Sequence, residues 1–327
     1  MSAFCENDQS AATYPRNIFG QPRPEKTPLI RCLQWGPNLQ DGERNTTYQS
    51  TKELTDAAAK DRLRVVFMPN CTESTSAPDL QEYRKLFKYY SVPSEVLIER
   101  MRSVNHAFGA SQAIDSEAQI SWCHFLCRQI DVRGSKIQNF GYLRDEKGGQ
   151  SQTLSASNLW IMCDFFLHVA EDKSVTFLCF GVPNLILLRF EKLLIKTSWK
   201  DILQEPYLLF VIVFDELHGL FHELSTSLGL ALRQVEEAAI SQAGAPPLSF
   251  RQLHGANTTA DLRNCTFMIE TAEAILSAHE AMLESLDEMD KPVIPNLITL
   301  RRSTVSAIRY RKRTFKSTLL KVYSLER

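Results

Sequence analysis

The chain has 327 residues, of which 44% are hydrophobic and 23% are charged, and its formal net charge is −1. This composition is typical of a soluble globular protein with a substantial core, and the length suits one large domain or two ordinary ones. A near-neutral charge excludes the broad basic field that attracts nucleic acid, so we expect no nucleic-acid partner.

Residues 1–60 are polar and contain five prolines, so we expect an irregular or partly disordered segment with little core of its own. The first ten residues, MSAFCENDQS, lack the cationic and apolar regions of a secretory signal. We therefore expect a cytoplasmic location. The eight cysteines are expected to be reduced thiols and not a disulfide framework.

Residues 61–199 combine strand and helix patterns. The run RLRVVFMP (62–69) predicts a strand, and residues 78–109 predict two helices that are separated at Pro93, the second ending at Gly109. Further apolar, aromatic-rich runs predict more strands: SWCHFLCRQI (121–130), NFGYLR (139–144), SNLWIMCDFFLHVA (157–170) and SVTFLCFG (174–181). Several of these runs are apolar on both faces, which indicates a sheet covered on two sides. A helix over 183–197 is expected to close this region.

Residues 200–327 predict long helices. A leucine-rich stripe indicates a helix over 201–241, with Pro206 near its start, and a second helix covers 250–289. In the second helix Met268, Ile275, Met282 and Met289 recur every seven residues, as in a coiled-coil seam. Helices of about 40 residues span roughly 60 Å, so we expect an extended helical arm and not a compact bundle.

The last two helices segregate charge. Every charge between Thr266 and Asp290 is acidic, whereas nearly every charge from Arg301 onward is basic. The final helix, beginning near Leu297, is amphipathic: Val305, Ile308, Phe315, Leu319 and Val322 share one face. The cations that we predict to make interactions are Arg309, Arg311, Lys312, Arg313 and Lys316. They form either a solvated face partly neutralised by the acidic helix, or a surface for an anionic membrane or a partner.

Two groups of residues could bind metal. Asp215, His218 and His222 would share one helix face, a spacing that can hold zinc, but Gly219 stands where a zincin has its glutamate. The alternative for these three is an ordinary solvated or packing face. Cys123 and Cys127 would share one face of a strand with His124 on the other, which favours buried apolar cysteines over a zinc site.

Catalytic signatures are absent from the sequence. It contains neither a glycine-rich phosphate loop nor a G-x-S-x-G elbow, so we expect no enzymatic activity. The longest apolar run, YLLFVIVF (207–214), is far shorter than the ~20 residues that a membrane span requires.

Several segments together resemble the N-terminal cytosolic domain of a fungal family of CorA-like proteins. The resemblance covers roughly residues 80–327 and consists of packing patterns. The segments that carry it are LFKYYSVPSEVLIERMRSVNHAFG (86–109), WCHFLCRQI (122–130), GYLRDE (141–146), LQEPYLLFVIVFDEL (203–217) and FKSTLLKVYSLE (315–326).

CorA-type divalent-cation transporters have a cytosolic α/β/α domain, a pair of long helices and a stalk helix that continues into the first of two membrane spans. The resemblance thus implies an α+β fold, with an α/β/α layered domain at 61–199 followed by long antiparallel helices and a stalk-like helix at 200–327. It also implies Mg²⁺ as the associated ion, and self-association or assembly with full-length CorA-like subunits.

The sequence departs from this family in having neither a Gly-Met-Asn motif nor a membrane span. We therefore expect a non-enzymatic interaction or regulatory module, either a truncated transporter or a soluble relative. Membrane association is expected only through a continuation of the native chain or a spanning partner. The alternative is a metal-dependent enzyme that uses Asp215, His218 and His222.

Overall fold

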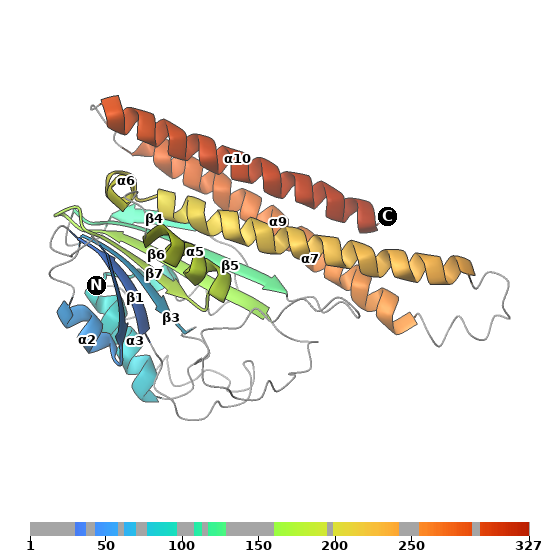
Figure 1. Cartoon of the computed structure of the whole chain (residues 1–327), viewed down its shortest axis with the longest axis horizontal. Coiled ribbons are helices and arrows are strands. Elements are labelled where there is room, and N and C mark those ends of the chain that lie inside the picture. Colours follow the sequence, from blue (N-terminus) through green and yellow to red (C-terminus); the bar gives the residue numbers. More distant parts are fainter. Residues whose placement is uncertain are drawn as a thin grey trace.

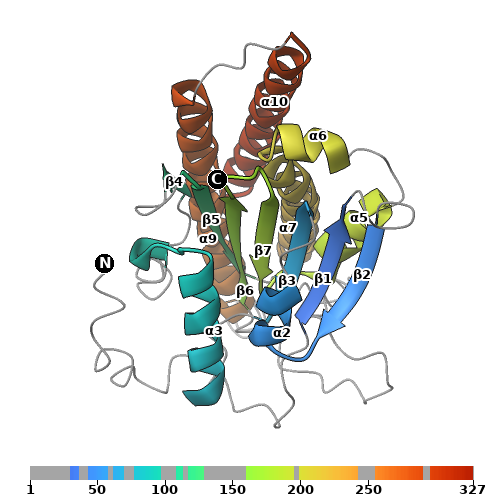
Figure 2. The same cartoon turned by 90° about the vertical axis from the view of Figure 1, so that its left-hand side faces the viewer.

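The fold was analysed in a computed structural model, which describes residues 30–36, 43–57, 62–69, 77–96, 108–112, 117–128, 160–194, 199–241, 255–289 and 295–326. In this part of the chain one mixed sheet has helices on both faces, with three long helices on one side (Figures 1 and 2). The predicted fold class, an α+β layered domain followed by long helices, is confirmed.

The sheet has seven strands in the order β2-β1-β3-β7-β6-β5-β4. Their bounds are β1 Ile30–Trp35, β2 Glu43–Tyr48, β3 Leu63–Met68, β4 Phe108–Gln112, β5 Gln119–Arg128, β6 Trp160–Val169 and β7 Val175–Phe180. The central strands β3 and β7 run parallel, and every other neighbouring pair is antiparallel. The strands predicted at 62–69, 121–130, 157–170 and 174–181 are confirmed, whereas 139–144 lies outside the described residues.

The central strands are buried on both faces. In β3, Val65 and Phe67 point into the core beneath the long helices, while Val66 and Met68 point into a second core on the opposite face. All six residues of β3 and of β7 are buried. Two-sided burial explains why these strands read as continuous apolar runs in the sequence.

On one face of the sheet the described residues form α5 Asn184–Leu194, α6 Trp199–Gln204, α7 Leu208–Ser241 and α9 Gly255–Glu288. The last helix, α10 Pro295–Glu326, packs on α7 and α9. The chain runs out along α7, back along α9 and out again along α10 (Figure 1). The three long helices were predicted, but the first begins at Leu208 and not at residue 201, because residues 199–204 form the separate helix α6. Pro206 lies in the turn between α6 and α7.

A single hydrophobic core joins the sheet to the long helices. The same cluster contains Phe165 and Phe177 of the sheet, Phe214 of α7, Met282 of α9 and Phe315 of α10. The predicted division between residues 199 and 200 therefore does not separate two cores. The three long helices project past the sheet at one end, and α10 lies on α7 and α9, away from the strands (Figure 1).

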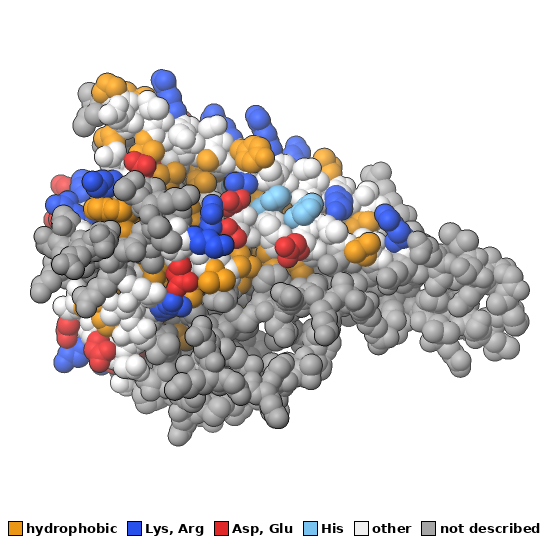
Figure 3. Space-filling view, in the orientation of Figure 1, with side chains coloured by type: hydrophobic (Ala, Val, Ile, Leu, Met, Phe, Trp, Pro, Cys, Tyr) orange, Lys and Arg blue, Asp and Glu red, His pale blue; other side chains and the backbone are white. Residues whose placement is uncertain are grey.

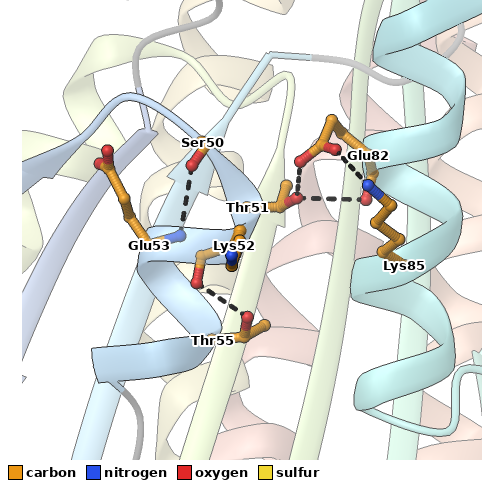
Figure 4. Close-up of polar contacts among 7 residues, drawn as sticks. All are labelled: Ser50, Thr51, Lys52, Glu53, Thr55, Glu82 and Lys85. Carbon is orange, nitrogen blue, oxygen red and sulfur yellow. Dashed lines mark hydrogen bonds and ion pairs between the residues drawn. The ribbon is translucent and has the colours of Figure 1, made fainter.

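The opposite face is covered by α2 Thr51–Asp56 and α3 Ala77–Tyr89. Ser50 caps α2 by accepting a hydrogen bond from the backbone N–H of Glu53 at 3.2 Å. The Thr51 hydroxyl contacts Glu82 of α3, whose carboxylate also accepts from Lys85 at 2.8 Å (Figure 4). Hydrogen bonds from Lys85 and Thr51 lower the pKa of Glu82, so this carboxylate is ionised and links the two helices.

The prediction that residues 1–60 are irregular was wrong for residues 30–36 and 43–57. These ranges contain β1, β2 and α2, and β1 pairs with the central strand β3. Ile30, Cys32, Leu33 and Trp35 are each at most 3% exposed. These strands were missed because the surrounding sequence is rich in proline and the edge strand ERNTTY (43–48) is polar. Their formation depends on pairing with residues elsewhere in the chain, which local sequence does not reveal. Residues 1–29 lie outside the described part.

Gly109 does not end a helix, as was predicted, but lies in β4. A Cβ atom at this position would stand 2.2 Å from the ring of Trp122 on the neighbouring strand β5. Glycine is thus required here because the Trp122 indole lies against the backbone. From the sequence alone, a glycine needed for such a close contact looks the same as a glycine that ends a helix. Of the second predicted helix, residues 94–96 are helical and residues 97–107 lie outside the described part.

Candidate interaction surface of the long helices

The inner face of α10 is held by an aromatic cluster with Phe315 at its centre. The Phe315 ring centroid lies 5.0 Å from that of His218 and 5.8 Å from that of Phe221, both on α7. It also lies 5.6 Å from the ring of His279 on α9. The predicted apolar face is confirmed, because Ile308, Phe315, Leu319 and Val322 are buried and Val305 packs against the same core.

His279 is buried at the centre of this helical layer. Its ring lies 4.1 Å from Phe214, and its Nδ1 is 2.8 Å from the backbone oxygen of Ile275. Burial lowers the pKa of His279 to about 4, so the imidazole is neutral at pH 7 and Nδ1–H donates to that carbonyl. The His279 imidazole can therefore pack among the aromatic rings of the three helices without placing a charge in the core.

Ion pairs border the buried stripe on both sides. Arg311 of α10 contacts Asp215 of α7 at 2.7 Å, and Lys312 contacts Glu280 of α9. On the α9 side the Tyr323 hydroxyl also reaches Glu273. Arg311 and Lys312, two of the five predicted interaction residues, are thus engaged within the chain.

The other three predicted interaction residues, Arg309, Arg313 and Lys316, are exposed on the outer face of α10. Blue Lys and Arg side chains line the upper edge of the helical layer in Figure 3. Two large hydrophobic side chains lie among them, Tyr310 at 58% and Leu320 at 61% exposed. Exposed cations mixed with exposed apolar groups are suited to contact with an anionic surface.

The neighbouring helix α9 presents the opposite charge. Its exposed side chains include six carboxylates: Glu270, Glu273, Glu280, Glu284, Asp287 and Glu288. Two of these carboxylates contact α10: Glu273 accepts from the Tyr323 hydroxyl, and Glu280 accepts from Lys312. The chain therefore displays a basic face and an acidic face on adjacent helices.

The predicted metal ligands Asp215, His218 and His222 lie on α7 near its junction with α10. Asp215 pairs with Arg311 and also lies 3.9 Å from Arg189 of α5. The two imidazole rings are stacked with centroids 6.1 Å apart, and His218 Nε2 is 3.3 Å from the Thr318 hydroxyl. Within the described ranges, no three or more His, Cys, Asp or Glu side chains are grouped so as to hold a metal ion.

The cysteines near His124 are buried, as predicted. Cys123 and Cys127 face the core beneath the long helices, and burial raises the pKa of each thiol to about 12. His124 points to the other face, where its Nδ1 lies 2.8 Å from the Asp164 carboxylate on β6. The six cysteines that the structure describes are all buried and form no disulfide with one another.

A polar junction that sequence reasoning missed joins the sheet to all three long helices. Glu205, between α6 and α7, is 2% exposed and forms an ion pair with Arg301 of α10. Arg301 also donates to the backbone oxygen of Leu286 on α9, at 3.2 Å. Burial raises the pKa of Glu205, whereas the bond to Arg301 opposes that rise.

Tyr207 completes this junction. Its hydroxyl lies 2.8 Å from Ser121 of β5 and 3.3 Å from Ser285 of α9. The one available signal in the sequence was Glu205 directly before Pro206, but a carboxylate before a helix start is common at protein surfaces. Its burial depends on where α10 lies, which local sequence does not specify.

In the described part of the chain, no helix is both long enough and apolar enough to cross a membrane. No protein-family model matches the chain, and no curated protein is significantly similar to it. Among solved structures, the cytoplasmic domain of ZntB from Vibrio parahaemolyticus RIMD 2210633 is similar over 91% of this chain and 95% of that one. The sequence identity is 11% and the TM-score is 0.40, values too low to assign a function.

Proposed function

We propose that this chain is a non-enzymatic domain of the CorA-like type that acts by self-association through its long helices. It would serve as an interaction or regulatory module related to divalent-cation transport. The proposal rests on the sequence resemblance and on the order of layers, an α/β domain followed by three long helices. The observation that carries it is the exposed basic face of α10 beside the exposed acidic face of α9.

Charge complementarity favours a second copy of this chain as the partner. The outer cations Arg309, Arg313 and Lys316 of one copy would meet the carboxylates of α9 on another. Tyr310 and Leu320 would lose their exposed apolar surface in such a contact. Assembly with full-length CorA-like subunits would use the same faces.

Sedimentation velocity across a range of protein concentrations tests this proposal. We expect concentration-dependent association that weakens as salt is raised, because exposed charges are screened over about 10 Å at 0.1 M. The triple variant Arg309→Glu, Arg313→Glu, Lys316→Glu should remain monomeric. The matched control reverses three exposed cations away from α10, Lys52, Arg62 and Lys88, and should associate like the wild type.

A second candidate is binding of an anionic membrane surface by the same face of α10. It is favoured by Tyr310 and Leu320, because cations mixed with exposed apolar side chains are typical of helices that lie on membranes. Vesicles with and without anionic lipid would distinguish the two functions. Monomeric protein that binds anionic vesicles through these cations would replace the self-association proposal.

The metal-dependent enzyme considered from the sequence is not retained as a candidate function. Its proposed carboxylate, Asp215, is engaged by Arg311 at 2.7 Å. A carboxylate bound to a guanidinium is a poor general base and a poor metal ligand, since its lone pairs and charge are already used.

A further inference from the structure

His218 and His222 are the most exposed pair of neighbouring imidazoles in the described part of the chain. They stand at positions i and i+4 of α7, with His222 exposed and His218 half-buried. Their ring planes are inclined by only 29° and the centroids lie 6.1 Å apart. Figure 3 shows pale-blue histidine side chains at the surface of the helical layer. Two histidines at this spacing on one helix face can bind the same metal ion.

We propose that His218 and His222 form a two-imidazole chelate for a divalent transition metal of the Zn²⁺ or Ni²⁺ class. Water or an external ligand would fill the remaining coordination positions, which agrees with the lack of a third protein ligand among the described residues. Imidazole nitrogen suits zinc and nickel, whereas Mg²⁺ requires oxygen ligands. This inference is independent of the proposed function.

The contacts of His218 with α10 hold its ring in one orientation, as metal binding requires. Its Nε2 lies 3.3 Å from the Thr318 hydroxyl on α10, and its ring meets Phe315 edge-on at 5.0 Å. Metal-binding histidines generally use their second nitrogen for a hydrogen bond that orients the ring. If Nε2–H donates to Thr318, the lone pair on Nδ1 remains for the metal.

The local charge does not oppose a cation. Arg311 and Arg189 contact the same helix and are paired with Asp215 and Glu216 of α7. Lys321 of α10 donates to the Thr226 hydroxyl at 3.0 Å, one turn beyond His222. The carboxylates of Asp215 and Glu216 therefore offset the charges of the two arginines. The bound metal would lie on the surface of α7, beside the line where α7 packs on α10.

The test is calorimetric titration of the full chain with Ni²⁺ and with Zn²⁺ under reducing conditions. We expect one site per chain, unaffected by a large excess of Mg²⁺. His222→Ala changes an exposed side chain and should weaken metal binding by more than about 10-fold. Removal of a residue that only orients a metal ligand typically costs about 10-fold to 100-fold in affinity, and loss of the ligand itself should cost no less. Glu223→Ala, at the adjacent exposed position, is the matched control and should bind like the wild type.

Thr318→Val provides a second readout, since it removes the hydroxyl but keeps the shape of the side chain. It should weaken binding while both imidazoles remain, which a purely structural role of Thr318 would not do. Equal binding by the wild type and His222→Ala, or binding that is lost only when cysteines are blocked, would overturn the proposal. So would displacement of Ni²⁺ by Mg²⁺.

Discussion

The two faces of α10 differ in nearly every physical respect. The inner face buries Ile308, Phe315 and Leu319 against α7 and α9, whereas the outer face exposes Arg309, Arg313 and Lys316. Fold stability depends on the first, because buried apolar area and close packing supply the free energy. The second adds little to stability and is available for contacts between molecules. Substitutions on the two faces should therefore have separable effects.

The largest expected effect is the loss of Phe315. Phe315→Ala should lower the free energy of unfolding by about 3–5 kcal/mol, because the cavity would lie among side chains of three helices. Urea unfolding monitored by circular dichroism measures this loss. Leu320→Ala on the outer face, where the side chain is 61% exposed, should change stability by no more than about 0.5 kcal/mol. Similar losses for the two variants would contradict the assignment of inner and outer faces.

The buried pair at the start of α10 should have the next largest effect. Arg301→Met leaves the Glu205 carboxylate buried without its guanidinium, which should cost roughly 3 kcal/mol at pH 7. The variant raises the pKa of Glu205 further, so the folded state takes up a proton more readily than the unfolded state. The deficit in stability relative to wild type should thus narrow as pH falls from 7 to 5, because both proteins share the His279 titration and differ only in that of Glu205. A deficit that is constant over this range would show that Glu205 is not buried as described.

His279 links the inner face to acid sensitivity. Its pKa is about 4 in the folded chain against an ordinary 6.5, so the unfolded state binds more protons between these values. Stability should therefore decrease as pH falls from 6.5 to 4, by up to about 1.4 kcal/mol per pH unit from this residue. His279→Leu should remove that part of the slope in melting curves recorded at several pH values. An unchanged slope would mean that His279 titrates normally.

The smallest effect on stability is expected at the rim of the α10 contact, the ion pairs that border its buried face. Lys312→Ala removes a surface ion pair with the exposed Glu280 carboxylate, so it should lower stability only slightly, and less at high salt. Unfolding in urea at low and high ionic strength measures this difference. A loss comparable to that of Phe315→Ala would mean that the rim, and not the aromatic cluster, holds α10 in place.

The spacing of apolar residues in the sequence was sufficient to predict most of the helical layer and its buried faces. The spacing of Met268, Ile275 and Met282 identified the buried seam of α9, and the stripe around Phe315 identified the inner face of α10. Long helices carry many repeats of their pattern, so their existence can be read locally. The short strand β1 was missed because its burial depends on pairing with β3, more than 25 residues away along the chain.

The candidate sites were predicted only in part. The basic helix was identified, but local sequence could not tell that Arg311 and Lys312 turn toward Asp215 and Glu280 while Arg309 and Arg313 face outward. The Glu205–Arg301 pair was not foreseen, since residues 96 positions apart meet only through the packing of α10. Which polar side chains pair is decided by tertiary contacts that no local pattern encodes.

The measurement that tests the central claim most directly mixes two oppositely reversed variants in sedimentation velocity. One carries Arg309→Glu, Arg313→Glu and Lys316→Glu on α10, and the other carries Glu284→Lys, Asp287→Lys and Glu288→Lys on α9. If the two faces meet between copies, each variant alone should be monomeric and the equimolar mixture should associate. A mixture that stays monomeric where the wild type associates would contradict the pairing of these faces, and a monomeric wild type would contradict self-association.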